Sequence, residues 1–303
     1  MTALVTGASR GVGAHIAEEL AKEQMRLVLC ARTERTLEKV AERLRQYGNQ
    51  VAILPADLSR REELERLSQR ATAVFGSIDV LVSNAAMACF LPYHRIRPED
   101  LEKEAMVNYM APMLLTRLLL PGMLARGNGH IVAISSLNAE VPLACLASYA
   151  ATKAGVASFV RSLRPELAGT GVSASVVLPG VVWNAGMVKD FERSSEFRMT
   201  KLAGGCTPAQ IARGVVRAIK HDMPEVIVNH PPVRPILILL RLMPKTMESL
   251  LRMIGVQEPS KAAAQMNVDA GGKITGVGIV PEFLDLHSSP AQKEHVVQQE
   301  HRT

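Results

Sequence analysis

The chain opens with an apolar segment, a glycine-rich turn and a helical pattern in direct succession. Ala3–Thr6 is typical of a buried strand, and the segment after it has glycines at positions 7, 11 and 13. Residues 15–24, HIAEELAKEQ, then have the spacing of an amphipathic helix. Glycines at such a turn let a pyrophosphate approach the N–H groups that begin the helix. An ordinary glycine-rich turn would have the same pattern, so the interpretation depends on the rest of the chain.

A second polar cluster follows a predicted strand in the middle of the sequence. Residues 131–135 are predicted to form this strand, and Ser136 comes directly after it. Tyr149 and Lys153 lie four residues apart in a segment predicted to be helical, so their side chains share one helix face. An adjacent ammonium favours the phenolate and is expected to lower the pKa of the tyrosine. The three side chains therefore predict a proton-transfer site, although a Tyr–Lys pair alone is also found on ordinary helix surfaces.

The spacing TGxxxGxG, together with Ser136, Tyr149 and Lys153, resembles the short-chain dehydrogenase/reductase family over about residues 2–230. The resemblance implies an α/β fold, a doubly wound, Rossmann-type parallel sheet of about seven strands. It also implies hydride transfer between a nicotinamide cofactor and a ketone or secondary alcohol. No metal site is implied.

The resemblance further assigns catalytic roles to four residues. Tyr149 would protonate the developing alkoxide, and Lys153 would lower the pKa of Tyr149 and bind the ribose. Ser136, thirteen residues before Tyr149, would orient the carbonyl oxygen. Asn108 would hold a water for proton relay, because Pro112 lacks the N–H that would otherwise bond the Asn108 carbonyl.

The predicted cofactor is NADP(H). The second predicted strand ends with Ala31 and Arg32, where an NAD-selective site would have an acid, and Arg10 adds a second cation. Arginine is suited to a 2′-phosphate because its planar fork donates two parallel hydrogen bonds. The resemblance assigns cofactor binding to Gly7, Ser9, Arg10, Gly11, Val12, Gly13, Arg32, Asp57, Leu58, Asn84, Ala85, Tyr149, Lys153, Pro179, Gly180 and Val182. Ser83, Ala86 and Asn184 depart from the family pattern.

Charge and cysteine usage narrow the functional class. The net charge is +6, but Arg and Glu alternate along the predicted helices, which favours solvated helix faces and no nucleic-acid partner. The four cysteines lie far apart, so neither disulfides nor a structural zinc site are expected. The chain has no signal-peptide pattern and no apolar run long enough to span a bilayer, so a cytoplasmic protein is expected.

The last 70 or so residues are the part least similar to the family. Residues 1–230 are predicted to form the cofactor-binding and catalytic domain, and residues 231–303 a helical extension. Its apolar residues at helical spacing have three interpretations: a lid or subunit interface, a membrane-surface helix through 231–255, or ordinary core. A second candidate lid is the segment 185–205. The glycines at 272, 276 and 278 are interpreted as a chance repeat of the nucleotide-loop spacing.

The substrate is expected to be a hydrophobic carbonyl compound, such as a 3-oxoacyl, polyketide or steroid ketone. One reason is the apolar loop Leu143–Leu146, which precedes the predicted helix of Tyr149 and Lys153. A homodimer or homotetramer is expected from the resemblance, and peripheral membrane association is an open alternative. A different function class also stays open: an NADP(H)-binding sensor or scaffold without turnover.

Overall fold

The structure is a computed structural model that describes residues 1–183 and 204–243, together with residues 245, 246, 249, 253, 261 and 264. Its centre is a seven-stranded parallel sheet with the strand order β3-β2-β1-β4-β5-β6-β7. The predicted doubly wound sheet is therefore confirmed. The strands are β1 (Thr2–Thr6), β2 (Arg26–Cys30), β3 (Val51–Ile53), β4 (Val80–Ser83), β5 (Gly129–Ile134), β6 (Val172–Pro179) and β7 (Glu225–Val228).

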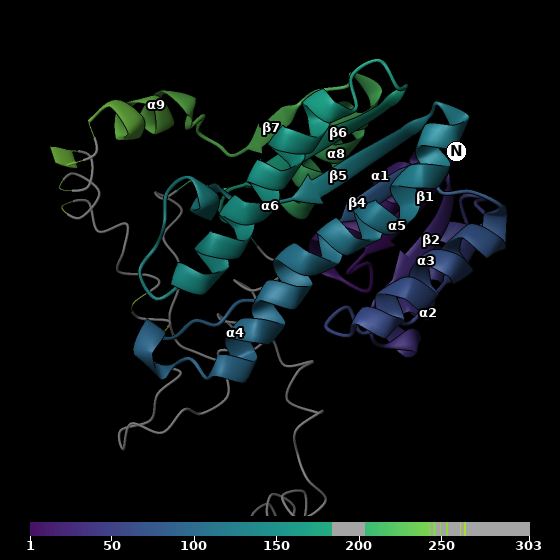
Figure 1. Ribbon diagram of the computed structural model, residues 1–303, viewed down its shortest axis with the longest axis horizontal. Helices are drawn as coiled ribbons and strands as arrows, with labels where there is room; N and C mark the ends of the chain where they lie inside the picture. Colours follow the sequence, from purple (N-terminus) through teal and green to yellow (C-terminus); the bar gives the residue numbers. More distant parts are fainter. Residues whose placement is uncertain are drawn as a thin grey trace, which may run out of the picture.

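Helices cover both faces of this sheet: in Figure 1, α5 and α6 cross in front of it, and α1 and α8 lie behind. The α-helices are α1 (Gly11–Lys22), α2 (Glu34–Arg45), α3 (Arg61–Phe75), α4 (Pro98–Ala105), α5 (Ala111–Arg126), α6 (Ala147–Glu166), α8 (Pro208–Lys220) and α9 (Arg234–Leu242). The shorter turns are the 3-10 helices η1 (Tyr93–Arg95) and η3 (Leu137–Ala139) and the π-helix η2 (Met106–Met110).

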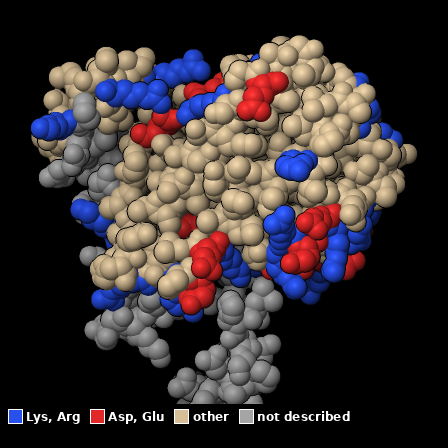
Figure 2. Space-filling view, viewed as in Figure 1, with Lys and Arg blue, Asp and Glu red and all other residues tan. Residues whose placement is uncertain are grey.

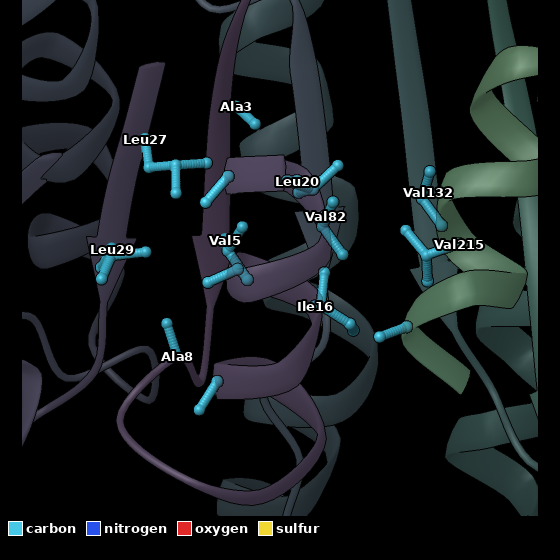
Figure 3. Packing of buried hydrophobic residues seen from close by; sticks show 14 of the residues in the cluster. Ala3, Val5, Ala8, Ile16, Leu20, Leu27, Leu29, Val82, Val132 and Val215 are labelled. Atoms are coloured by element: carbon cyan, nitrogen blue, oxygen red, sulfur yellow. The ribbon is translucent and has the colours of Figure 1, made fainter. Parts of the chain in front are cut away.

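The core consists of two apolar layers, one on each side of the sheet. Alternate residues of β1 point to opposite faces: Val5 packs with α1, α2 and α8, and Leu4 packs with α3, α5 and α6. Figure 3 shows Ile16 of α1 and Val215 of α8 in the first of these layers. Burial on both faces explains why the central strands read as continuous apolar runs in the sequence.

The chain reverses its winding direction between β1 and β4, which are neighbours in the sheet but far apart in sequence. In an open parallel sheet this arrangement leaves a crevice at the carboxyl ends of the two strands. The glycine-rich turn follows β1, the segment from Asn84 follows β4, and Ser136 follows the adjacent β5. The fold thus gathers the predicted motifs at one edge of the sheet.

The helix α9 follows β7 and lies apart from the two core layers (Figure 1). None of its residues is buried, and Ile238 and Leu242 are 58% and 72% exposed. Arg234–Leu242 is therefore an exposed helix, and most of the segment for which a core position was one alternative lies outside the described residues. Its Arg241 donates to Glu140 at 2.5 Å, and Arg161 of α6 donates to the same carboxylate at 2.7 Å.

Several expectations fall outside the described residues, including the lid segment apart from positions 204 and 205, most of the extension and the glycines at 272–278. Within the described part of the chain, no helix combines the length and hydropathy needed to cross a membrane. All four cysteines are free thiols.

Candidate active site

The glycine-rich turn between β1 and α1 is so tightly packed that side chains are excluded. Gly7 has φ +66°, a left-handed conformation, and a Cβ added at Gly13 would lie 2.1 Å from the Gly7 carbonyl oxygen. Helix α1 begins with no side-chain cap from Arg10 and no acidic residue in its first turn. Its N–H groups, which include those of Gly11 and Val12, therefore fit an anionic group such as the pyrophosphate of a dinucleotide.

The two arginines that predicted NADP(H) lie at the same edge of the sheet. The Ala8 N–H donates to the Cys30 carbonyl at 3.0 Å, so the glycine-rich turn that contains Ser9 and Arg10 lies beside the end of β2. Arg32 follows β2 directly and is partly buried, whereas Arg10 is exposed. A 2′-phosphate beside this turn would therefore lie near two positive charges, that of Arg10 after β1 and that of Arg32 after β2.

Asp57 and Leu58 follow β3 and continue this edge. The Ala56 N–H donates to the Ala31 carbonyl at 3.0 Å, which places the segment next to the end of β2. Asp57 Oδ1 accepts from the N–H and the hydroxyl of Ser59 at 3.0 and 2.8 Å. Leu58 is buried. The bonds from Ser59 thus hold the Asp57 carboxylate within its own turn. This turn lies beside the segment that contains Ala31 and Arg32.

Asn84 joins the ends of β1 and β4. Its Nδ2 donates to the carbonyls of Thr6 and Gly7 at 3.0 and 3.3 Å. The hydroxyl of Thr6 accepts in turn from the N–H groups of Asn84 and Ala85 at 3.0 and 3.2 Å. Thr6 was not identified in the sequence as a site residue, and a hydroxyl at the last position of β1 is the signal that could have found it.

Ser136, Tyr149 and Lys153 come together at the end of β5. The Ser136 hydroxyl lies near enough to Tyr149 to act on the pKa of its phenol, and the Lys153 Nζ lies 5.7 Å from the centre of the Tyr149 ring. The Lys153 ammonium donates to the Ile134 carbonyl at 2.8 Å. Ser135 has a different role, because its hydroxyl donates to the Lys153 carbonyl at 2.7 Å.

The pKa of Tyr149 is raised in the structure, which contradicts the expectation that it is lowered. Tyr149 is 8% exposed, and burial raises the pKa of its phenol, which outweighs the lowering by Ser136. Burial also lowers the pKa of Lys153 to about 8. The reason for the difference is that spacing along a helix shows which groups are neighbours, but not how completely water is excluded from them.

Asn108 lies in the π-helix η2, in which the Ala111 N–H donates to the Met106 carbonyl five residues earlier. The irregular helix predicted from Pro112 is thus present, although as a π-turn. The buried side chain of Asn108 donates to the Met87 carbonyl at 2.8 Å and to the Thr152 hydroxyl at 3.1 Å. Its Oδ1 accepts from the Met87 N–H at 2.8 Å. Asn108 therefore connects the segment after β4 to helix α6.

An apolar surface surrounds Tyr149. Ala88 and Leu146 are buried against it, and Phe90 and Leu143 pack around this cluster while remaining partly exposed. Phe90 and Leu143 come from opposite sides, the segment after β4 and the loop before α6. The described residues at this edge thus combine an ionisable phenol with a mainly hydrocarbon lining.

The loop after β6 is the remaining predicted part of the site. Pro179 ends β6, and the Gly180 N–H donates to the Val228 carbonyl at 2.9 Å. A Cβ at Gly180 would lie 1.9 Å from Asn229 Oδ1, so a side chain is excluded there. Val182 forms a parallel bridge with Cys206. Asn184 lies outside the described residues.

Comparison with known proteins gives consistent results. The sequence profile of the short chain dehydrogenases matches residues 1–196. The ketoacyl reductase HetN of Nostoc sp. is 38% identical over 275 residues, which cover 89% of this chain and 94% of that protein. A 3-oxoacyl (acyl-carrier-protein) reductase of Agrobacterium tumefaciens, solved with NADP bound, superimposes with a TM-score of 0.69 at 28% identity, covering 75% of this chain and 92% of that one.

A metagenomic short-chain oxidoreductase, solved in complex with NADP, superimposes with a TM-score of 0.64 at 32% identity. The match covers 75% of this chain and 96% of that chain. The profile match, the sequence relatives and the solved structures all point to the same family as the residues at the sheet edge. The chain belongs to the short-chain dehydrogenase/reductase family.

Proposed function

We propose that this protein is an NADP(H)-dependent oxidoreductase that interconverts a ketone and a secondary alcohol. The observation that carries the proposal is the common position of two features at one sheet edge. The glycine-rich turn follows β1, and Ser136, near Tyr149, follows β5. A dinucleotide held at the first would extend toward the second. NADP-bound relatives in the same family support this choice of cofactor.

In this mechanism NADP(H) supplies or accepts the hydride, and the protein supplies orientation and proton transfer. Because burial raises its pKa, Tyr149 keeps its proton at neutral pH, which is the state that an acid needs for ketone reduction. Its hydroxyl would donate to the developing alkoxide, and the Ser136 hydroxyl would donate to the same oxygen. Lys153 would hold the ribose hydroxyls through its ammonium.

The proton that Tyr149 gives up must be replaced from solvent. We propose that the Asn108 carbonyl holds a water for this purpose, and the support is that Pro112 has no N–H to donate to it. The side chain of Asn108 is committed to Met87 and Thr152, which fixes the direction of that carbonyl. Proton relay is therefore assigned to the backbone of Asn108.

We assign the cofactor preference to Arg10 and Arg32. Both would face the 2′-phosphate of NADP(H), while the glycines at 7, 11 and 13 and the N–H groups of Ser9 and Val12 would approach the pyrophosphate. Asp57 and Leu58 would border the adenine, and Asn84 and Ala85 the adjacent ribose. Pro179, Gly180 and Val182 would border the nicotinamide.

The substrate proposed is a hydrophobic carbonyl compound. The support is the apolar cluster of Ala88, Phe90, Leu143 and Leu146 around Tyr149. A 3-oxoacyl chain, a polyketide or a steroid ketone would each bury hydrocarbon there. The Nostoc relative is named a ketoacyl reductase, which favours the first of these for initial tests.

We propose that residues 1–230 act as the catalytic domain and that the extension from 231 covers the substrate side. Two contacts support this. Burial raises the pKa of the Cys145 thiol, in the loop before α6, and the nearby charge of Lys261 opposes that rise; Arg241 of α9 pairs with Glu140 after η3. Ala264 is 1% exposed. A membrane-surface role for α9 is the alternative, which the exposure of Ile238 and Leu242 favours.

We also propose a homo-oligomer, either a homodimer or a homotetramer. The broad face over α5 and α6 in Figure 2 carries few charged residues across its centre. Leu118 and Leu124 of α5 are each 40% exposed. An uncharged, partly apolar face of this kind fits a second copy of the chain.

The proposed function is tested by following NADPH absorbance with acyl thioesters, steroids and cyclic ketones in parallel. Consumption of NADPH by at least one hydrophobic ketone, and none by the Tyr149→Phe variant, is the expected result. Tight NADPH binding with no turnover on the whole panel would instead favour a cofactor sensor or scaffold. A protein that binds neither NADPH nor NADH would contradict both functions.

A further inference from the structure

A buried asparagine lies at the start of the loop that connects Ser136 to helix α6. Asn138 is 7% exposed and belongs to η3, the short helix that directly follows Ser136. The mechanism proposed above gives no role to its side chain. A buried amide loses its hydrogen bonds to water, so the partners that it gains in the fold indicate what it does there.

The backbone of Asn138 binds the hydroxyl of Ser136. Its N–H donates to Ser136 Oγ at 3.1 Å, a bond that caps η3. A hydroxyl that accepts through its oxygen keeps its own proton to donate elsewhere. In the proposed mechanism that proton goes to the substrate oxygen. Because this bond is made by the backbone, a change of the Asn138 side chain leaves it in place.

The side chain of Asn138 binds the loop further along the chain. Its Oδ1 accepts from the Leu143 N–H at 2.8 Å, across five residues of sequence. Leu143 in turn packs against the apolar cluster that contains Tyr149. The bond from Oδ1 therefore closes the loop and determines where the Leu143 side chain lies beside Tyr149.

The nitrogen of the same amide indicates that the oxygen is the group in use. Among the described residues, Asn138 Nδ2 has no hydrogen-bond partner although it is buried. A buried donor without a partner destabilises the fold, and an apolar side chain of similar size would avoid that cost. An apolar side chain could not, however, accept from the Leu143 N–H. The acceptor oxygen is therefore the physical reason for an asparagine at this position.

Two further observations indicate that the loop is held in one conformation. Cys145, two residues after Leu143, has φ +60°, a left-handed conformation that residues other than glycine rarely adopt, so its surroundings must hold it there. Glu140 accepts from Arg161 of α6 at 2.7 Å, which attaches the start of the loop to the helix of Tyr149. The hydrogen bond to Leu143 lies between these two points.

We propose that Asn138 is a positioning residue that sets the selectivity for the hydrocarbon part of the substrate. Through its bond to Leu143 it holds one side of the apolar lining next to Tyr149. A substrate with a long hydrocarbon chain gains affinity from a lining that is already in place, whereas a short substrate gains little. The inference deepens the proposed function and rests on it for the nature of the substrate.

The first experiment measures the hydrogen bond itself by NMR. In protein labelled with ¹⁵N-leucine, the amide signal of Leu143 is assigned by its absence from a Leu143→Met variant. Asn138→Ala should speed hydrogen exchange of this amide about tenfold, because its acceptor is lost. Equal exchange rates in the folded wild type and the folded Asn138→Ala variant would overturn the proposal.

Asn49→Ala is the matched control for this experiment. Asn49 Nδ2 donates to the carbonyls of Ala21 and Met25 at 2.9 and 3.1 Å, so the variant also loses hydrogen bonds between distant segments. Asn49 precedes β3, however, at the sheet edge opposite the candidate site. Asn49→Ala should therefore leave both the Leu143 exchange rate and substrate selectivity unchanged. A loss of selectivity as large as that of Asn138→Ala would indicate general destabilisation and contradict the proposal.

The second experiment compares the reduction of a long-chain and a short-chain 3-oxoacyl thioester by NADPH. Asn138→Ala should raise the KM of the long-chain compound about fivefold, the factor that corresponds to one lost hydrogen bond. Both kcat values and the short-chain KM should stay within about twofold of wild type, since the backbone bond to Ser136 remains. An equal rise of both KM values, or a fall in kcat alone, would contradict the selectivity role.

A double-mutant cycle shows whether Asn138 acts through Leu143. Leu143→Ala alone should raise the long-chain KM, and the addition of Asn138→Ala should raise it little further. Independent effects that multiply would contradict the proposal. Asn138→Asp covers the case in which Asn138→Ala does not fold, because it keeps an oxygen acceptor. It should retain the slow exchange of the Leu143 amide, and fast exchange in this folded variant would overturn the inference.

The wild-type kinetics separate this inference from the proposed function. If the wild type reduces the long-chain thioester and Leu143→Ala leaves its KM unchanged, the inference fails alone. If the wild type reduces other ketones but discriminates against hydrocarbon chains, the selectivity role is also wrong and the oxidoreductase function stands. If the wild type binds NADPH and reduces no ketone at all, the proposed function fails and the selectivity role fails with it.

Discussion

Replacing Gly13 by alanine should both destabilise the fold and weaken NADPH binding. The added Cβ would lie 2.1 Å from the Gly7 carbonyl oxygen and 2.6 Å from Asn84 Nδ2, so either the backbone or the partly buried Asn84 amide must move. Overpacking of this kind costs about 1–3 kcal/mol. Displacing Asn84 also weakens its hydrogen bonds to Thr6 and Gly7, at about 1 kcal/mol each. The expected loss of unfolding free energy is about 3–5 kcal/mol.

The assay is urea unfolding together with NADPH titration, followed by the fluorescence of Trp183, the one tryptophan of the chain. Gly122→Ala is the matched control, because its Cβ in helix α5 would approach the flexible end of Arg126 at 3.3 Å. Alanine there should stabilise the helix by up to about 1 kcal/mol. If Gly13→Ala showed the unfolding midpoint and NADPH affinity of Gly122→Ala, the packing argument would be refuted.

Four further predictions test other parts of the molecule. NADPH should bind at least tenfold more tightly than NADH, and Arg32→Asp should reduce this difference in affinity. Equal affinities of the wild type for the two cofactors would contradict the cofactor assignment. Tyr149→Phe should abolish turnover and preserve NADPH binding, whereas Lys153→Ala should lose both; an active Tyr149→Phe would exclude the proposed acid. Because burial lowers the pKa of His130 from 6.5 to about 4, the native state should lose about 3 kcal/mol as pH falls from 6.5 through 4. Urea unfolding of the His130→Gln variant should not show this loss of stability. If the unfolding free energy of the variant fell with pH as that of the wild type does, the prediction would be refuted. Truncation after Pro232 should retain NADPH binding but impair turnover or assembly, and full activity with unchanged assembly would remove support for the lid or interface.

Local pattern was sufficient for most of the fold. The apolar residues of Ala3–Thr6 indicated a buried strand, and the glycines at 7 and 13 indicated a tight turn after it, as the structure confirms. The pattern of α9 was informative only in part. Apolar spacing in Arg234–Leu242 identified a helix with a hydrophobic face, but not whether anything packs against that face.

Interactions between distant segments explain what was missed at the site. Thr6 bonds Asn84 across 78 residues of sequence, and Asn108 bonds Thr152 across 44. The shift of the Tyr149 pKa was predicted with the wrong sign because the spacing along the chain showed the charged neighbour of Tyr149 but not its burial.

The π-turn at Met106–Met110 has a consequence for tolerated changes in chain length. A π-turn contains one residue more than an α-turn, so deleting one residue here would leave regular helix and let α4 and α5 keep their places. A deletion within α5 would instead rotate every later residue of that helix by about 100° about its axis. The shortening that the fold absorbs most easily is therefore at Asn108 itself, where it would preserve the architecture and displace the carbonyl assigned to proton relay.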